Sequence, residues 1–226
     1  MLETSSGPWW TVHEELQKAQ IDYGAAKDQA RRLDELLAYN CDAIEKALFE
    51  SHSGSSAFPQ QQYWFGLDLQ SLQTPYSELV EMIKSLNPQV GDLWLDLGAA
   101  YGRLGVVLGF LRPGVRFVGY EYVDERVEEG SRIFKFWNLR QAKMRQVDLA
   151  SKGFELGRAQ VYFLYDFGSK RDVYSVLEKL RLQAQQGPIC VVARGRGVRQ
   201  WILQDFPWLS SQESLSPYPN WTVFQS

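Results

Sequence analysis

Short apolar segments alternate with segments of helical periodicity from Ser77 onward, and this alternation constrains the fold more than any other feature. Such repetition predicts an α/β fold with a mostly parallel central sheet and helices on both faces. Ligands of these sheets bind at the carboxyl ends of the strands. Trp221–Phe224 is predicted to add a hairpin strand at the sheet edge. The other predicted strands are residues 93–95, 117–120, 144–147, 161–164 and 189–193, and the predicted helices are residues 77–86, 103–111, 124–139 and 170–185.

The first 50 residues differ from the rest in pattern and in charge. Thr11–Glu50 contains no Pro, one Gly and apolar residues at helical spacing, which predicts helices. Residues 1–50 carry five Lys or Arg and ten Asp or Glu, a net charge of −5, whereas the remaining 19 basic and 17 acidic residues give +2. We therefore predict a helical extension at 1–50, a linker and aromatic segment at 51–73, and the main domain at 74–226. The extension is interpreted as a helical hairpin packed on that domain or, alternatively, as a lid or a docking element.

The segment Leu93–Gly105 reads LWLDLGAAYGRLG and joins a buried strand to a helix through a turn of small residues. Asp96 ends the strand, where its carboxylate can accept hydrogen bonds from a ligand's ammonium group. Gly98 permits a sharp turn, and Ala100 and Gly102 are small enough for a ligand to approach the backbone. A dinucleotide fingerprint needs Gly at positions 98, 100 and 103, so Ala100 and Arg103 weaken that interpretation.

The next two predicted strands also end in acidic residues. Glu121 follows Val118-Gly119-Tyr120, at a position suited to accept both hydroxyls of a ribose, and Asp148 follows the next strand, at a position suited to an adenine amino group. Taken singly, each acid could equally be a solvated loop residue or a helix cap. In this order, and with the glycine turn, the three acids point to one nucleoside-binding site.

This set resembles the class I S-adenosylmethionine-dependent methyltransferases, whose first motif reads acid-x-Gly-x-Gly-x-Gly and is followed by ribose and adenine acids. Asp96, Gly98, Gly102, Glu121 and Asp148 match, and Ala100 replaces the middle glycine. The resemblance covers about residues 74–197. It implies a Rossmann-like methyltransferase fold, S-adenosyl-L-methionine as cofactor and methyl transfer as the activity.

Within that superfamily the chain looks most like the seven-strand lysine methyltransferases of the disruptor-of-telomeric-silencing type and their bacterial relatives. Thr74–Ile83 resembles their cofactor-covering loop and the helix after it, although Gln73 departs from the usual glutamate. The resemblance implies cofactor contacts at Thr74, Tyr76 and Tyr122. A simpler interpretation is that Thr74 or Ser77 starts the helix.

Tyr165-Asp166-Phe167 follows a predicted strand where the resembled family has Asn-Asn-Phe and contacts its substrate. Methyl transfer needs a positioned neutral nucleophile and the exclusion of water, so Tyr165 and Phe167 can form a dry wall and Asp166 can orient an amine. The alternative makes the aromatic residues core and Asp166 a cap of the helix that begins at Lys170. Arg194 and Arg196 are interpreted as solvated residues of a turn or as a clamp for an acidic substrate.

Composition limits the remaining options. The net charge of −3 and a pI near 5.5 give no general attraction to nucleic acid or membranes, so we expect no direct nucleic-acid binding, although a local basic patch is compatible with them. Two distant cysteines and two histidines argue against a disulfide framework and a metal site. Met1–Trp10 does not resemble a signal peptide and no apolar run reaches membrane-spanning length, which predicts a soluble cytoplasmic protein.

Three functional hypotheses follow. The first is a methyltransferase that acts on a protein, at a lysine; the second is a small-molecule N- or O-methyltransferase. The third is a cofactor-binding interaction module without catalysis. Tyr63-Trp64-Phe65 is interpreted as an anchor into the core or a wall of a substrate channel, and the sequence leaves the oligomeric state open.

Overall fold

A computed structural model describes residues 7–18, 22–52, 69–215 and 220–226, so Tyr63–Phe65 and most of the predicted linker lie outside the described residues. It contains a seven-stranded sheet in the order β3-β2-β1-β4-β5-β7-β6. The first five strands of this order are parallel, and β7 pairs antiparallel with β5 and β6. The strand order reverses between β1 and β4, which is where open α/β sheets bind their ligands.

The helices and strands agree closely with the predicted alternation. The helices are α1 (Pro8–Gln17), α2 (Tyr23–Leu37), α3 (Cys41–His52), α5 (Leu69–Leu72), α6 (Tyr76–Leu86), α7 (Arg103–Leu111), α8 (Asp124–Phe136), α9 (Lys170–Ala184) and α10 (Arg196–Asp205), with a 3-10 helix at Glu213–Leu215. The strands are β1 (Leu93–Leu97), β2 (Arg116–Glu121), β3 (Ala142–Gln146), β4 (Val161–Tyr165), β5 (Cys190–Arg194), β6 (Ser210–Ser211) and β7 (Trp221–Gln225).

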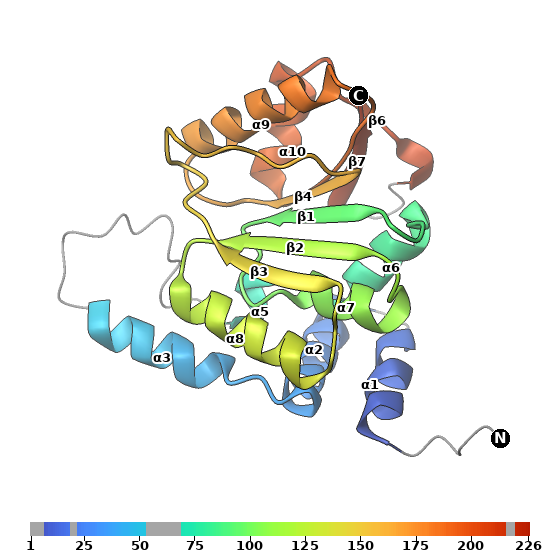
Figure 1. Ribbon diagram of the computed structural model, residues 1–226, viewed down its shortest axis with the longest axis vertical. Coiled ribbons are helices and arrows are strands. Elements are labelled where there is room, and N and C mark those ends of the chain that lie inside the picture. Colours follow the sequence, from blue (N-terminus) through green and yellow to red (C-terminus); the bar gives the residue numbers. More distant parts are fainter. Residues whose placement is uncertain (1–6, 19–21, 53–68, 216–219) are drawn as a thin grey trace.

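The sheet separates two hydrophobic cores, and Figure 1 shows helices on both of its faces. Alternate residues of a strand face opposite sides, so Trp94 of β1 packs with the lower helices whereas Leu95 and Leu97 pack with α9 and α10. This two-sided burial explains why β1, β4 and β5 read as mostly apolar runs, whereas β3, at the edge of the sheet, is largely polar and exposed. The predicted α/β architecture with helices on both faces is confirmed.

Two features at the end of the chain differ from the prediction. The strand Trp221–Gln225 lies inside the sheet, because the two-residue strand β6 pairs with its outer side. Residues 196–205 form a helix rather than a solvated turn. Arg194 is buried; its Nε donates to Glu78 Oε2 at 2.9 Å, and its guanidinium lies 4.4 Å from the centre of the Tyr165 ring. Arg194 is therefore neither a solvated residue nor an accessible clamp.

The N-terminal helices share the lower core with the sheet. Val12, Leu16, Leu33 and Leu37 are almost completely buried in the same hydrophobic cluster as α6 and α7. Figure 1 shows α1, α2 and α3 below the sheet, on the same side as α8. The amphipathic pattern of residues 11–50 is thus explained by packing on the main domain, while the proposed domain boundaries stay predictions.

A buried polar cluster joins α2 to the start of α7. Asp34 pairs with Arg103, whose Nη2 also donates to Gln70 Oε1 at 2.9 Å. Tyr76 Oη donates to Asp34 Oδ1 at 2.8 Å, and the Arg103 guanidinium lies 4.8 Å from the centre of the Tyr76 ring. Because Arg103 directly follows the glycine turn, this cluster fixes the N-terminal helices to the ligand-binding end of the sheet.

None of the helices in the described part of the chain combines the length and the apolar character that a membrane span requires. Cys41 and Cys190 are both free thiols. No group of three potential metal ligands occurs among residues 7–18, 22–52, 69–215 and 220–226.

Candidate functional site

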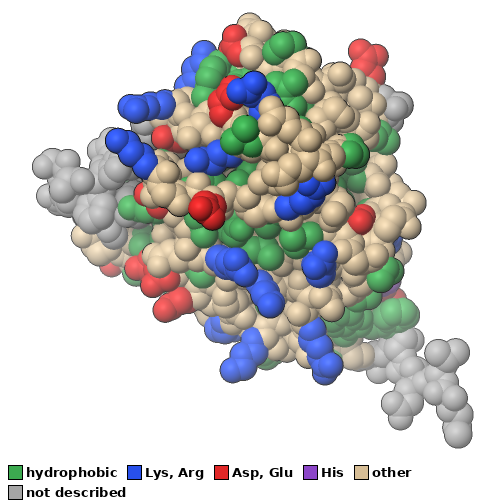
Figure 2. All heavy atoms as spheres, turned by 45° about the horizontal axis from the view of Figure 1, so that its top comes forward, with side chains coloured by type: hydrophobic (Ala, Val, Ile, Leu, Met, Phe, Trp, Pro, Cys, Tyr) green, Lys and Arg blue, Asp and Glu red, His purple; other side chains and the backbone are tan. Residues whose placement is uncertain are grey.

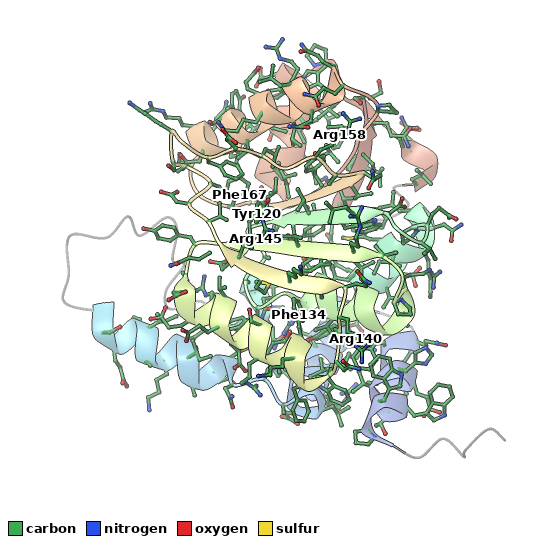
Figure 3. The ribbon with its side chains drawn as sticks, in the orientation of Figure 1. Tyr120, Phe134, Arg140, Arg145, Arg158 and Phe167 are labelled. Carbon is green, nitrogen blue, oxygen red and sulfur yellow. The ribbon has the colours of Figure 1, made fainter. Side chains whose placement is uncertain are left out.

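A cavity of about 280 Å³ lies at the carboxyl ends of β1, β2 and β4. Its wall combines the turn after β1, the end of β2, the loop after β3 and the residues that follow β4. Figure 3 shows Tyr120 and Phe167, two of its aromatic lining residues, close together at this end of the sheet. The cavity thus occupies the place where the strand order reverses, as the sequence pattern predicts for a ligand.

The turn after β1 adopts backbone conformations that explain its small residues. Gly98, Ala100 and Gly102 all have positive φ, at 94°, 46° and 76°. A Cβ atom on Gly98 would lie 3.2 Å from Phe167 Cβ, so this glycine also permits the close approach of the residues after β4. Gly98 and Ala100 line the cavity, whereas a Cβ on Gly102 would collide with Phe134 and Met144. Gly102 therefore serves packing between the turn, α8 and β3 rather than ligand approach.

Glu121 ends β2 in the cavity wall, and its side chain is held by the backbone. Its Oε2 accepts a hydrogen bond from Ala100 N at 2.8 Å, and its Oε1 accepts one from Val123 N at 3.0 Å. A carboxylate has about four acceptor positions, so two bonds leave capacity for a ligand. The carboxylate that the sequence assigns to a ribose is thereby fixed at the cavity and joined to the glycine turn.

Arg126 and Glu45 extend this arrangement into the N-terminal helices. Arg126 Nε and Nη2 donate to the two oxygens of Glu45 at 2.8 and 3.0 Å, and Arg126 Nη1 lies 3.9 Å from Glu121 Oε1. Tyr101 Oη donates to Glu45 Oε1 at 2.7 Å. All four residues line the cavity. Sequence reasoning missed Glu45, Tyr101 and Arg126, because only folding brings α3 beside α8.

Asp96 is buried beneath the turn, on the face of β1 that also carries Trp94. It does not line the cavity, and its Oδ1 has no hydrogen-bond partner among the described residues. Burial raises the pKa of Asp96 well above its usual range, and the negative charge of Glu121 adds to the effect. An unpaired buried carboxyl oxygen is costly, so Asp96 stays a candidate for contact with a ligand.

Replacing Asp96 by Asn is expected to stabilise the ligand-free protein at pH 8. Because the folded state holds the Asp96 proton to a higher pH than the unfolded chain, stability falls as pH rises from about 4 through the raised pKa. The advantage of Asp96→Asn over the parent should therefore be largest at pH 8 and shrink toward pH 4. Urea unfolding across this range measures it, with the exposed Asp148→Asn as the matched control. A constant difference between parent and variant would contradict the assignment.

The structure brings Tyr165, Asp166 and Phe167 to the cavity. Tyr165 Oη donates to the carbonyl oxygen of Ser71 at 3.4 Å. Asp166 accepts hydrogen bonds from the backbone N–H groups of Gly197, at 3.2 Å, and Val198, at 2.8 Å. The Asp166 carboxylate therefore caps α10 and not the helix that begins at Lys170, which is capped by Ser169 with Asp172. The alternative role as a helix cap holds only for a different helix from the one expected.

Three further residues of the predicted site, Thr74, Tyr76 and Asp148, do not line the cavity. Thr74 is buried, and its carbonyl oxygen accepts a hydrogen bond from Arg103. Tyr76 is buried in the cluster with Asp34, so it is not placed to stack on an adenine in the cavity. Asp148 is exposed and its Oδ1 accepts from Ala150 N at 2.9 Å, although Val147, Leu149 and Ala150 line the cavity. Tyr122, by contrast, does line it.

Gln73 carries the clearest unpaired polar group of the cavity wall. Only 4% of this residue is exposed, and neither its Oε1 nor its Nε2 has a hydrogen-bond partner among the described residues. Leaving both ends of a buried amide unpaired costs a few kcal/mol, on the order of 1–3 for each group. A ligand in the cavity can satisfy them. The sequence signal was present, since Gln73 directly precedes the predicted cofactor-covering loop, but its neutral side chain departs from the family glutamate.

Comparisons with known proteins agree on the fold. A scan against protein-family models gave no match, and no curated protein matched the sequence. The chain is similar in structure to an S-adenosylmethionine-dependent O-methyltransferase from Thermotoga maritima, with a TM-score of 0.51, 15% identity, and 68% of this chain and 65% of that chain covered.

Two further similar structures have TM-scores of 0.50. One is precorrin-6y C5,15-methyltransferase from Geobacter metallireducens, with 14% identity, and 70% of this chain and 91% of that chain covered. The other is TrmN from Thermus thermophilus, with 11% identity, and 68% of this chain and 48% of that chain covered. None of the three is named as a lysine methyltransferase, so this finer resemblance receives no support. At such identities the likeness establishes architecture alone, and this chain has the Rossmann-like fold of the class I methyltransferases.

Proposed function

We propose that this protein is an S-adenosyl-L-methionine-dependent methyltransferase and that its cofactor binds in the cavity at the carboxyl ends of β1, β2 and β4. The observation that carries the proposal is Glu121, whose buried carboxylate ends β2, lines the cavity and accepts a hydrogen bond from the glycine turn. The methyltransferase fold, with the turn at the strand-order reversal, supports it. A carboxylate in this position suits the two hydroxyls of a ribose.

The residues of the cavity fit such a cofactor. Glu121 would hold the ribose, and Val147 and Leu149 would offer apolar contact to the adenine. Two of the buried polar groups without hydrogen-bond partners among the described residues are the amide of Gln73, in the cavity wall, and one carboxyl oxygen of Asp96, beneath the turn. The amino and carboxylate groups of a methionine moiety have the donors and acceptors that these atoms need.

The bound cofactor supplies a methyl group on a sulfonium, which a nucleophile can take by in-line displacement. The chain then has to orient the acceptor and keep water out. Tyr165 and Phe167 form an aromatic wall at the cavity. Since both oxygens of Asp166 accept backbone N–H bonds from α10, we assign this residue to holding the wall and α10 together.

The acceptor implied by the lysine methyltransferase resemblance is a protein lysine, and this stays a hypothesis. Incubating the protein with methyl-labelled cofactor and a cell extract tests it. Label recovered in protein and released as methyllysine would support the hypothesis. Label recovered in RNA or in small molecules would show that the acceptor is not a protein lysine. Cofactor binding without methyl transfer would favour the interaction module without catalysis.

Calorimetric titration tests the proposal itself. We expect S-adenosylhomocysteine to bind the intact chain at one site. The substitution Ala150→Trp places a large ring on an exposed residue of the cavity wall and is expected to weaken binding by at least about tenfold, whereas Ser175→Trp, on the exposed face of α9, should leave binding unchanged.

Absence of binding by the folded parent would overturn the proposed function. Equal binding by the parent and Ala150→Trp would remove the cofactor from this cavity. Circular dichroism and urea unfolding of all three proteins establish that the comparison is made between folded chains.

A further inference from the structure

A second hollow lies between α8 and β3, apart from the cavity. Its volume is about 400 Å³, and its lining includes Lys135 of α8, Arg140 of the following turn, and Lys143 and Arg145 of β3. All four cationic side chains are exposed. We call this hollow the basic groove. Figure 3 shows Arg140 and Arg145 toward opposite ends of β3, with Phe134 beneath the strand.

The basic groove carries uncompensated positive charge. None of the residues that line it is acidic. No ion pair within 4.0 Å joins any of its four cations to a carboxylate in the described part of the chain, and Arg140 Nε donates a hydrogen bond to Asn138 Oδ1 at 3.0 Å. Figure 2 shows Lys and Arg side chains gathered on the lower half of the pictured face, where few acidic ones appear. The groove is thus suited to a ligand with several negative charges.

The groove also leads to the proposed cofactor cavity. Arg145 lies near the carboxyl end of β3, and the residues that directly follow this strand include Val147, Leu149 and Ala150 of the cavity wall. Among the strands of the described residues, β3 is the last at its side of the sheet and pairs with β2 alone. Figure 3 shows Arg145 at the same end of the sheet as Tyr120 and Phe167. A polyanion bound in the groove therefore lies beside the cavity rather than on a remote face.

We propose that the basic groove binds the phosphate backbone of a single nucleic-acid strand and that this nucleic acid carries the methyl acceptor. The second part rests on the proposed methyltransferase function; the binding itself does not. Successive phosphates present a charge at every nucleotide, so one strand can supply a partner to each cation. Lys143 and Arg145 are two residues apart on a strand and point the same way, about 7 Å apart. Positively charged grooves that follow the backbone are the usual means of holding single strands.

An acidic peptide is the competing partner, and the arrangement favours it less. Its carboxylates sit on flexible side chains that must be ordered one by one, at an entropic cost for each. The two guanidinium groups of the groove form paired hydrogen bonds to phosphates and carboxylates alike, so the preference rests on the charge that a nucleic-acid strand carries at every nucleotide. The negative net charge of the whole chain does not oppose this proposal. In physiological salt, screening weakens the interaction of a ligand with exposed charges that lie more than about 8 Å away.

Fluorescence anisotropy with a labelled 20-nucleotide single-stranded RNA tests the groove. If all four cations contact phosphates, the logarithm of the binding constant should fall with the logarithm of the salt concentration with a slope of about −2.8. Lys143→Gln with Arg145→Gln should halve that slope to about −1.4 and weaken binding roughly tenfold at low salt. Both residues are exposed, so the fold should persist.

The matched control is Lys84→Gln with Arg181→Gln, which removes the same charge from exposed residues of α6 and α9. We expect it to bind RNA as the parent does. Equal losses in the two double variants, or displacement of the RNA by equimolar polyglutamate, would overturn the proposal. So would the absence of RNA binding by the parent at low salt.

Two further measurements separate this proposal from the proposed function. The variant Lys143→Gln with Arg145→Gln should bind S-adenosylhomocysteine with the affinity of the parent. The parent should transfer labelled methyl groups into an RNA fraction, and this variant should transfer fewer. Failure of cofactor binding with intact RNA binding would refute the methyltransferase function alone. Cofactor binding with no label in RNA would refute the acceptor assignment.

Discussion

Asp34→Ala is expected to lower the free energy of unfolding by about 3–5 kcal/mol, because it leaves the charge of Arg103 buried without its carboxylate. Only 3% of the Arg103 side chain and 11% of the Asp34 side chain are exposed. Asp34 also accepts hydrogen bonds from Tyr76 Oη and Gln70 Nε2, at 2.8 and 3.1 Å. One substitution thus removes an acceptor from three buried side chains, those of Arg103, Tyr76 and Gln70. Urea unfolding at neutral pH measures the loss.

Two comparison variants test whether the loss of stability comes from the buried pair of Asp34 and Arg103. Glu35→Ala removes an exposed carboxylate from the neighbouring position of α2 and should change stability by less than about 0.5 kcal/mol. Asp34→Ala combined with Arg103→Met removes both charges and should recover much of the loss, since replacing a buried pair by apolar groups is often close to neutral. Similar stabilities of Asp34→Ala and Glu35→Ala would show that α2 is not fixed to α7 through this pair.

Glu121→Gln is expected to weaken S-adenosylhomocysteine binding about 100-fold. The substitution replaces a charged acceptor of two ribose hydroxyls by a neutral amide, and a hydrogen bond to a charged group contributes about 1.5–3 kcal/mol. The fold should survive, because the amide oxygen can still accept one of the two backbone N–H bonds, from Ala100 or Val123. Calorimetric titration of parent and variant measures the change in Kd.

Asp148→Asn provides the matched control for the acids of the site. Asp148 is exposed and accepts the backbone N–H of Ala150, a bond that Asn can also accept. We expect its Kd to stay within about threefold of the parent, a difference of less than 1 kcal/mol. If Asp148→Asn weakened binding as much as Glu121→Gln, the adenine role that the sequence suggests for Asp148 would hold. An unchanged Kd for Glu121→Gln would remove Glu121 from the site.

Glu45 is the residue through which the N-terminal helices reach this site. It makes two hydrogen bonds to Arg126 and one to Tyr101, and all three residues line the cavity. Arg126 Nη1 also lies 3.9 Å from an oxygen of Glu121. Glu45 thus leaves Glu121 available for a ligand by compensating the charge of Arg126. This role for a residue of the helical extension differs from the lid or docking element considered from the sequence.

The elements of the sheet could be predicted because each has a local cause. The strands β1, β4 and β5 are short, mostly apolar runs, and α7 begins and ends at the predicted residues, Arg103 and Leu111. Residues 196–205 were not predicted as helical because Arg196-Gly197 resembles a turn. Their helix is capped by Asp166, which is 30 residues earlier in the chain. The inner position of β7 depends likewise on pairing with the two-residue strand β6, which no periodicity can reveal.

The sequence by itself determined the α/β architecture, the turn at Gly98 and the acidic strand end at Glu121, because strand periodicity, glycine conformation and strand-end chemistry are local properties. Tertiary structure alone decided which polar groups meet. It buried Tyr76 against Asp34, placed Glu45 beside Arg126, and brought the Asp166 carboxylate to the N-terminus of α10. The net charge of −3 is a sum over the whole chain and does not show where charges gather. The tertiary structure places four cations together in the basic groove beside β3. Electrostatic and hydrogen-bonding interactions depend on distances in space, which spacing along the chain does not fix.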